Sequence, residues 1–221
     1  MMFDEGLFAL IGQGLLETLY MTLISTLMAY VIGLPVGMFL AVTDKEGIRP
    51  MPTVNRIVGG IVNILRSVPF VILLVAIMPF TRFITGAAIG STATIVPLVI
   101  AAAPFVARLV ESSAKEVDRG VVEASLSMGA STLEVVWKVL LPEAKPSLIV
   151  GAAIATTTIL GYTTMSGFTG GGGLGTIAIN YGYYRSQTDM MLVMVVVLVI
   201  IVQIFQEIGT FIANKCDKRI R

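Results

Sequence analysis

The sequence contains few of the residues on which catalysis and disulfide formation depend. Its 221 residues include no histidine and a single cysteine, Cys216. Without histidine the chain lacks the usual general base near neutral pH and a common metal ligand. A lone cysteine excludes an internal disulfide, and a net charge of +1 gives no reason to expect nucleic-acid binding. The composition therefore favours neither an enzyme nor a disulfide-stabilised or nucleic-acid-binding protein.

Charged residues are also scarce, at 13% of the chain, whereas hydrophobic residues make up 56%. A soluble domain of ordinary composition is about a quarter charged. The chain is therefore predicted to be an integral membrane protein.

Long apolar runs predict five membrane-spanning helices, because about 20 mostly apolar residues in a helix cross the hydrocarbon core. Runs of this length that alternate apolar and polar residues are absent, which excludes spanning strands. The expected fold is an all-α integral membrane protein with a single transmembrane domain over residues 1–221. Its spans are predicted at about 17–43, 57–80, 85–107, 147–166 and 190–212.

Lysine and arginine residues predict the orientation, because they accumulate in loops on the cytoplasmic side. With the N-terminus outside and the C-terminus in the cytoplasm, the outer loops carry only Arg82 and Arg185. The segment 111–145, between the third and fourth spans, is then cytoplasmic. The inner side carries most of the basic residues, namely Lys45, Arg49, Arg56, Arg108, Lys115, Arg119, Lys138, Lys145, Lys215, Lys218, Arg219 and Arg221.

The second half of this polar segment has clear helix signals. Ser131 and Glu134 have the spacing of a capping box, and Glu134 and Lys138 have that of a helical ion pair. Pro142 is expected to end the helix by disfavouring helical backbone at Leu141. Apolar residues at helical spacing predict one apolar stripe, made of Leu133, Val136, Trp137 and Leu140.

The first half, about 121–128, is predicted to be a short helix with small residues at Ala124, Ser125 and Ser127. Gly129 then allows a backbone turn that other residues resist. The segment is thus a helix–turn–helix with two interpretations. It is an amphipathic loop resting on lipid headgroups, or a rigid element that fits a cytoplasmic partner. Glu123 is correspondingly either solvated or paired with a basic residue of that partner.

Six residues of the segment resemble the EAA signature of ABC importer permeases. They are Glu123, Ala124, Ser125, Gly129, Leu141 and Pro142. In that family this loop docks into the ATP-binding subunit, so the resemblance implies a coupling role for these positions. Ser125 stands where the signature has a second alanine, a change small enough to leave the match intact.

The resemblance extends over nearly the whole chain to the permeases of methionine importers. It rests on VIGLPVG at 31–37, NILRSVPF at 63–70, PFTRF at 79–83, APFVAR at 103–108 and GGGGLG at 170–175. The resemblance implies the fold of type I ABC importer permeases and methionine import by alternating access across the bacterial cytoplasmic membrane. It also implies a homodimer of permeases, two ATPase subunits and an external methionine-binding lipoprotein. ATP and Mg²⁺ would be bound by the ATPase, so this chain is expected to hold no cofactor and no metal and to have no catalytic residue.

Polar residues cluster toward the outer end of the fourth span, among them Tyr162, Thr163, Met165 and Ser166. Their hydroxyls either bond back to their own helix or line a translocation path. By resemblance, Met165 lies where the family has a constriction, and a flexible thioether suits a soft plug.

Two other functions fit the sequence less well. A permease for another small solute or amino acid would share every feature except those of the methionine importers. An ATP-independent channel or facilitator would use the polar segment only as an anchor. A proton-coupled carrier usually needs a carboxylate in the middle of a span, and Glu17 and Glu207 lie near the ends of theirs.

Overall fold

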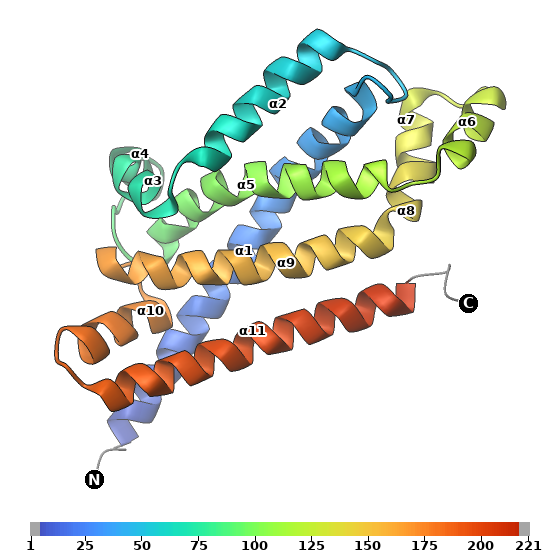
Figure 1. Ribbon diagram of the computed structural model, residues 1–221. Coiled ribbons are helices and arrows are strands. Elements are labelled where there is room, and N and C mark those ends of the chain that lie inside the picture. The colour runs from blue at the N-terminus through green and yellow to red at the C-terminus, as the bar shows by residue number, and fades with distance from the viewer. Residues whose placement is uncertain (1–4, 217–221) are drawn as a thin grey trace. The chain divides into compact units, whose positions relative to one another are not determined.

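Helices account for nearly all of residues 5–216, the part of the chain that this computed structural model describes (Figure 1). Strands are absent from that part. Lys218, Arg219 and Arg221, which belong to the predicted inner basic tail, lie outside the described residues. The expectation of an all-α fold is confirmed.

Within the described residues, four helices are long and apolar enough to cross a membrane. They correspond to the predicted first, third, fourth and fifth spans, although their ends differ from the predicted ones. The third span begins at Ser91, later than predicted, because Gly86 and Gly90 have φ of 77° and 109° and interrupt the helix. The four are α1 (Glu5–Thr43), α5 (Ser91–Lys115), α9 (Lys145–Met165) and α11 (Thr188–Cys216).

The predicted second span is broken in the structure. Helices α2 (Pro52–Ser67) and α3 (Phe70–Ala76) are bent by 94° at the break between them. Pro69 explains the break, because a proline disfavours helical backbone at the residue before it and donates no hydrogen bond. The prediction of one continuous helix over 57–80 is therefore wrong, and the described residues contain five spans only if this bent pair makes one crossing. Helix α4 (Met78–Thr85) follows α3.

The chain divides into two compact units, and the division passes through α1, α5, α9 and α11. Unit 1 comprises Met1–Met28, Val68–Ala102 and Thr156–Gln206, and unit 2 comprises Ala29–Ser67, Ala103–Ala155 and Glu207–Arg221.

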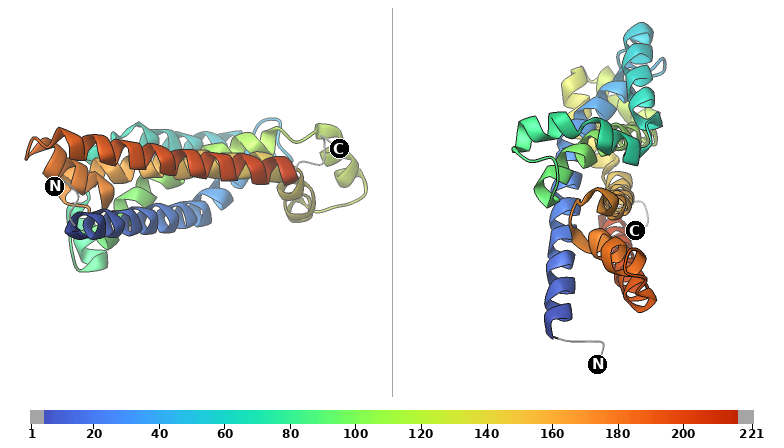
Figure 2. Two further views of the ribbon diagram at one scale, coloured as in Figure 1. Left: turned by 90° about the horizontal axis from the view of Figure 1, so that it is seen from below. Right: turned by 90° about the vertical axis from the view of Figure 1, so that its left-hand side faces the viewer.

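Unit 1 contains a set of short helices that we call the glycine-rich segment, residues 166–183. It consists of a 3₁₀ turn (Ser166–Thr169), α10 (Gly173–Ile177) and a π-helical turn (Ala178–Tyr183). Figure 2 shows α10, in orange, against the beginning of α11, in red, from two further directions. The core there is apolar and includes Leu160, Leu174, Ile177, Met190 and Met194.

Unit 2 contains a second set of short helices, which we call the helical hairpin, residues 119–143. It consists of α6 (Arg119–Ser127), α7 (Thr132–Val135), a π-helical turn (Val136–Leu140) and α8 (Leu141–Glu143) (Figure 1). The predicted helix–turn–helix is therefore confirmed. Val117, Val135, Leu140 and Ala144 form the apolar core beneath it.

Small residues bring the long helices of unit 2 close together. A Cβ atom added to Gly33 would lie 2.7 Å from Val106, and one added to Gly37 would lie 2.7 Å from Val110. Real Cβ atoms do not approach so closely, so α1 and α5 pack at a distance that only glycine permits. This contact fixes α5, the helix that precedes the hairpin, against α1.

Candidate functional site

Helix α6 carries the first part of the predicted coupling signature and is fixed at both ends. The Asp118 carboxylate accepts a hydrogen bond from the Gly120 N–H at 2.6 Å and caps the start of the helix. Gly129 ends the turn after it with φ of 87°, as the sequence predicts. Ser125 is buried and donates its hydroxyl to the Val121 carbonyl, whereas Glu123 and Ala124 are exposed. The signature thus presents its glutamate and its alanine to the outside of the unit.

Helix α7 begins at the predicted capping box. The Ser131 side chain accepts from the Glu134 N–H at 3.3 Å, and the Glu134 carboxylate accepts from the Ser131 N–H at 3.0 Å. Lys138 donates to the same carboxylate at 3.0 Å, which confirms the predicted ion pair. The hydrogen bond from the Ser131 backbone, followed by those from Lys138 and the Ser131 hydroxyl, lowers the pKa of Glu134 to about 2.

The four residues predicted to form one apolar stripe are divided between an exposed and a buried side of the hairpin. Leu133 and Trp137 are 71% and 66% exposed, and the buried residues are Val135 and Leu140. The cause is the π-helical turn, which adds a residue to the turn, so that residues five apart share a face. Two large apolar side chains therefore point away from the core of unit 2.

Pro142 does not end the helical run. Leu141 has helical backbone with φ of −64° and ψ of −46°, and Pro142 lies in the first turn of α8. The regular i→i−4 hydrogen-bond ladder that a proline interrupts is not kept here, because the Leu141 N–H bonds to the Val136 carbonyl, five residues back, in the π-helical turn. Leu141 is half-buried and Pro142 is exposed, so the two ends of the predicted signature are both accessible.

A groove of about 340 Å³ lies in unit 2 between α6 and the loop that joins α1 to α2. Its lining includes the apolar residues Ile48, Val122 and Leu126. Charged residues also line it, namely Asp44, Glu46, Lys115, Arg119 and Glu123. Glu123 therefore lines a groove that charged residues of other segments also line, rather than lying on an isolated helix face.

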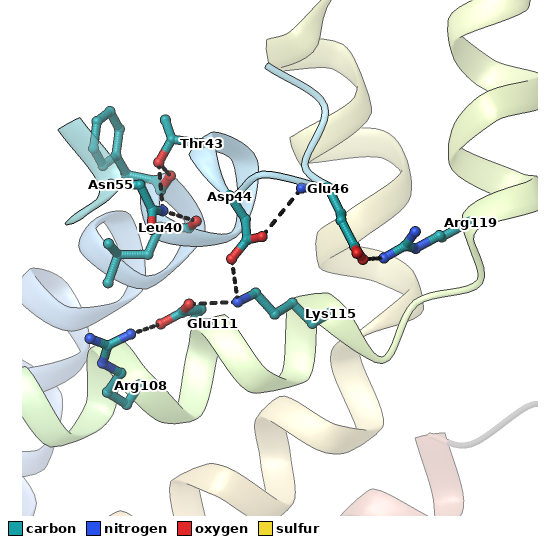
Figure 3. Close-up of polar contacts among 10 residues, drawn as sticks. Leu40, Thr43, Asp44, Glu46, Asn55, Arg108, Glu111, Lys115 and Arg119 are labelled. Carbon is teal, nitrogen blue, oxygen red and sulfur yellow. Dashed lines mark hydrogen bonds and ion pairs between the residues drawn. The ribbon is translucent and has the colours of Figure 1, made fainter. Parts of the chain in front are cut away.

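Polar contacts that the sequence interpretation missed surround this groove (Figure 3). Glu111 accepts from Arg108 at 2.6 Å and from Lys115 at 2.8 Å, and Lys115 also donates to Asp44 at 2.7 Å. The Lys115 hydrogen bond lowers the pKa of Asp44. Spacings of three and four residues in α5 were the available signal for the pairs within that helix.

The four predicted gate residues do not share one face. Tyr162 stacks on Phe70 with ring centroids 4.7 Å apart, and Met165 is 44% exposed. Thr163 and Ser166 are buried, and each donates its hydroxyl to its own helix, to the carbonyls of Leu160 and Thr163. The accessible surface of unit 1 at this point is thus formed by Met165 and part of Tyr162, which gives Thr163 and Ser166 a packing role.

The glycine-rich segment that follows Met165 is held by α1. The Glu17 carboxylate accepts from the Gly173 N–H at 2.7 Å, and the Thr18 hydroxyl accepts from the Leu174 N–H at 2.9 Å. These bonds satisfy the free N–H groups at the start of α10. No local pattern predicts these bonds, because the partners are 156 residues apart.

Among the described residues, no group of three or more histidine, cysteine, aspartate or glutamate side chains is arranged to hold a metal ion. The expectation that ATP and Mg²⁺ bind to a partner subunit stays a prediction.

Comparisons with known proteins agree with the architecture of both units. Residues 33–221 match the family described as binding-protein-dependent transport system inner membrane component. The chain is 48% identical to a probable D-methionine transport system permease protein MetI from Vibrio cholerae, over 92% of this chain and 90% of that protein. It is 46% identical to the methionine import system permease protein MetP of Bacillus subtilis, over 92% of this chain and 91% of that protein.

Solved structures give the same result. The chain matches a subunit of the inward-facing MetNI methionine ABC transporter with a TM-score of 0.96 and 45% identity, over 98% of this chain and 100% of that one. An amino acid ABC transporter crystallised with histidines shares the fold, with a TM-score of 0.74 and 19% identity over 97% of this chain and 100% of that one.

Proposed function

We propose that this chain is the membrane-spanning permease subunit of an ATP-driven methionine importer. The chain belongs to the family of inner membrane components of binding-protein-dependent transport systems. The observation that carries the proposal is the match to a MetNI subunit at 45% identity over 98% of the chain. This match covers both units. It therefore includes the two parts that the proposed transport uses, namely the hairpin and the accessible end of α9.

The working complex contains two copies of this chain, two cytoplasmic ATP-binding subunits and an external methionine-binding lipoprotein. The chain crosses the bacterial cytoplasmic membrane several times, with its N-terminus outside and its C-terminus in the cytoplasm. The ATPase subunits bind ATP and Mg²⁺ and carry out hydrolysis, and this chain converts their closure into movement of the spans. The excess of basic residues on the predicted inner side supports the orientation.

The helical hairpin is the part that contacts the ATPase. Glu123, Ala124, Gly129, Leu141 and Pro142 are at or near its surface, and Ser125 packs beneath them. Leu133 and Trp137 add an exposed apolar patch, and aromatic side chains of this kind often supply much of the binding energy at interfaces. A short helix capped at Asp118 and turned at Gly129 is rigid enough to move as one body.

Met165 forms the constriction of the path, supported by Tyr162. Its thioether is flexible and adapts its shape as neighbouring helices move. Stacking on Phe70 fixes the Tyr162 ring beside it. Thr163 and Ser166 support this end of α9 from inside the unit. Selectivity for methionine rests largely with the external binding protein.

Reconstitution tests the proposal. The chain, its ATPase and its binding protein are placed in liposomes, and uptake of a panel of labelled amino acids is measured with and without ATP. ATP-dependent uptake of methionine is expected. Uptake of a different solute would show that methionine is not the substrate. Solute flux through the chain alone, without ATP, would identify an ATP-independent facilitator instead.

A further inference from the structure

Charged side chains of unit 2 connect four segments of the chain (Figure 3). The segments are the loop between α1 and α2, helix α2, helix α5 and the start of α6. The connecting residues are Asp44, Glu46, Arg108, Glu111, Lys115 and Arg119. One pair of the series, Glu46 with Arg119, joins residues that are 73 positions apart in the sequence. Side chains rather than the backbone therefore join these segments.

Arg108 ties α5 to α2. Its Nη2 donates to the Gly59 carbonyl at 2.8 Å and to the Asn63 side chain at 2.9 Å, while its Nη1 donates to Glu111. A planar guanidinium that bonds through separate nitrogens fixes the direction of both helices. Gly59 permits the contact, because a Cβ atom there would lie 3.1 Å from Nη2.

Glu111 is the centre of the series. Its side chain is only 8% exposed and lies between Arg108 and Lys115. A carboxylate withdrawn from water is costly unless cations and hydrogen bonds compensate its charge. Both cations are therefore held near it, and Lys115 extends the connection to Asp44 in the loop.

The loop then reaches the hairpin. The Asp44 carboxylate accepts from the Glu46 N–H at 3.3 Å, and the Glu46 carboxylate pairs with Arg119, the first residue of α6. This last pair is exposed, with side chains 67% and 68% accessible. Exposed ion pairs contribute little to the stability of the fold, and the Glu46–Arg119 pair is therefore not needed for folding. Its position between the loop and α6 suits it to transmit movement instead.

We propose that these six side chains form a rigid linkage that carries movement of α6 to α2 and to the loop between α1 and α2. The linkage rests on the proposed function and names the residues through which the hairpin acts. Only Glu116, Val117 and Asp118 join α5 to α6 through the backbone. Apart from the apolar core beneath the hairpin, only side-chain contacts then limit rotation of α6 about this short joint when an ATPase pulls on it.

The Glu46–Arg119 pair gives the sharpest test because its loss leaves the fold intact. Glu46→Gln and Arg119→Gln are each reconstituted with the ATPase and binding protein, and methionine uptake and ATP hydrolysis are measured together. Uptake per ATP should fall by about fivefold or more, the lower end of typical coupling between sites, while the ATPase still co-purifies. Arg119→Lys, which keeps the charge, and Glu116→Gln, an exposed carboxylate outside the linkage, should retain the wild-type ratio. An unchanged ratio in both Gln variants would overturn the linkage.

Crosslinking tests rigidity directly. In a Cys216→Ser background, Glu46→Cys and Arg119→Cys are joined by a short bifunctional thiol reagent. Before the crosslinking reaction, the double-cysteine variant should show a low uptake of methionine per ATP hydrolysed. After the reaction, its uptake per ATP should return to the wild-type value. A ratio that stays low after crosslinking would contradict a contact that persists through the cycle. If the wild-type protein itself imports no methionine, the proposed substrate fails, whereas the linkage is judged only from each variant relative to wild type.

Discussion

The helical hairpin and the glycine-rich segment are built from similar parts but are stabilised in opposite ways. Each combines short helices with a π-helical turn. The hairpin is held by side chains, through the Asp118 cap, the Ser131–Glu134 capping box and ion pairs. The glycine-rich segment is bonded to Glu17 and Thr18 of α1, but its own packing is between backbones. A Cβ atom added to Gly167 would lie 2.5 Å from the backbone of Gly175, and one added to Gly175 would lie 2.5 Å from the Thr164 carbonyl oxygen.

This difference predicts where each region tolerates change. A surface held by side chains can lose one of them and remain folded. A segment packed backbone to backbone is destabilised by an added atom, because close packing leaves no room for it. π-Helical turns often occur at functional sites, and here one turns Trp137 outward while the other leads from α10 toward α11.

The largest effect is expected in the glycine-rich segment. Gly175→Ala places a methyl group 2.5 Å from Thr164 and should lower the free energy of unfolding by about 2–3 kcal/mol. The midpoint of thermal unfolding in detergent measures the change. Gly161→Ala, in α9 with no atom within 4 Å of the added Cβ, is the matched control and should not lower the midpoint. Equal midpoints for the two variants would contradict the close approach.

In the hairpin, Trp137→Ala should weaken partner binding without destabilising the chain. We expect loss of about 2 kcal/mol of binding to the ATPase, typical of a buried interface tryptophan. The change in unfolding should stay below about 0.5 kcal/mol, because the side chain is 66% exposed. Co-purification of the ATPase measures binding. Tyr183→Ala, with 65% exposure in the glycine-rich segment, is the control and should bind normally.

Gly129→Val tests the one position of the hairpin that depends on backbone conformation. Its φ of 87° should cost about 1–2 kcal/mol with a side chain present, although no atom lies within 4 Å of the Cβ position. Uptake per ATP should fall because α6 is reoriented, and Ser127→Ala, on the exposed side of α6, should not change it. If Gly129→Val lowers the unfolding midpoint but leaves uptake per ATP at the wild-type value, the substitution strains the backbone without affecting coupling. That result would refute the coupling role of Gly129.

The smallest effect is the pH dependence of the capping box. Glu134 has a pKa of about 2 in the folded chain against 4.5 for a free side chain. A lowered folded pKa contributes stability above about pH 4.5, and this stability is lost as the pH falls toward 2. The difference in unfolding midpoint between wild type and Glu134→Gln should therefore narrow from about pH 6 to about pH 3. A constant difference over that range would contradict an ionised capping residue.

Local features of this chain were predictable from the sequence. Apolar runs predicted the long helices, Ser131 and Glu134 predicted the start of α7, and Gly129 predicted the turn. Each depends on residues within a few positions of one another, and hydrogen bonds and capping at that range are nearly independent of the rest of the fold. The break at Pro69 lay within reach of the same reasoning, but the apolar run across it suggested a continuous span.

The sequence by itself determined that this is a helical membrane protein with a capped, glycine-turned hairpin. Only the tertiary structure decided which faces of those helices are free. Packing of Val135 and Leu140 selects the π-helical turn that exposes Trp137, and burial removes Thr163 and Ser166 from the surface beside Met165. Contacts such as Glu17 with Gly173 and Lys115 with Asp44 join residues 156 and 71 positions apart. Sequence spacing carries no information about such pairs, because they form only when packed helices bring their side chains together.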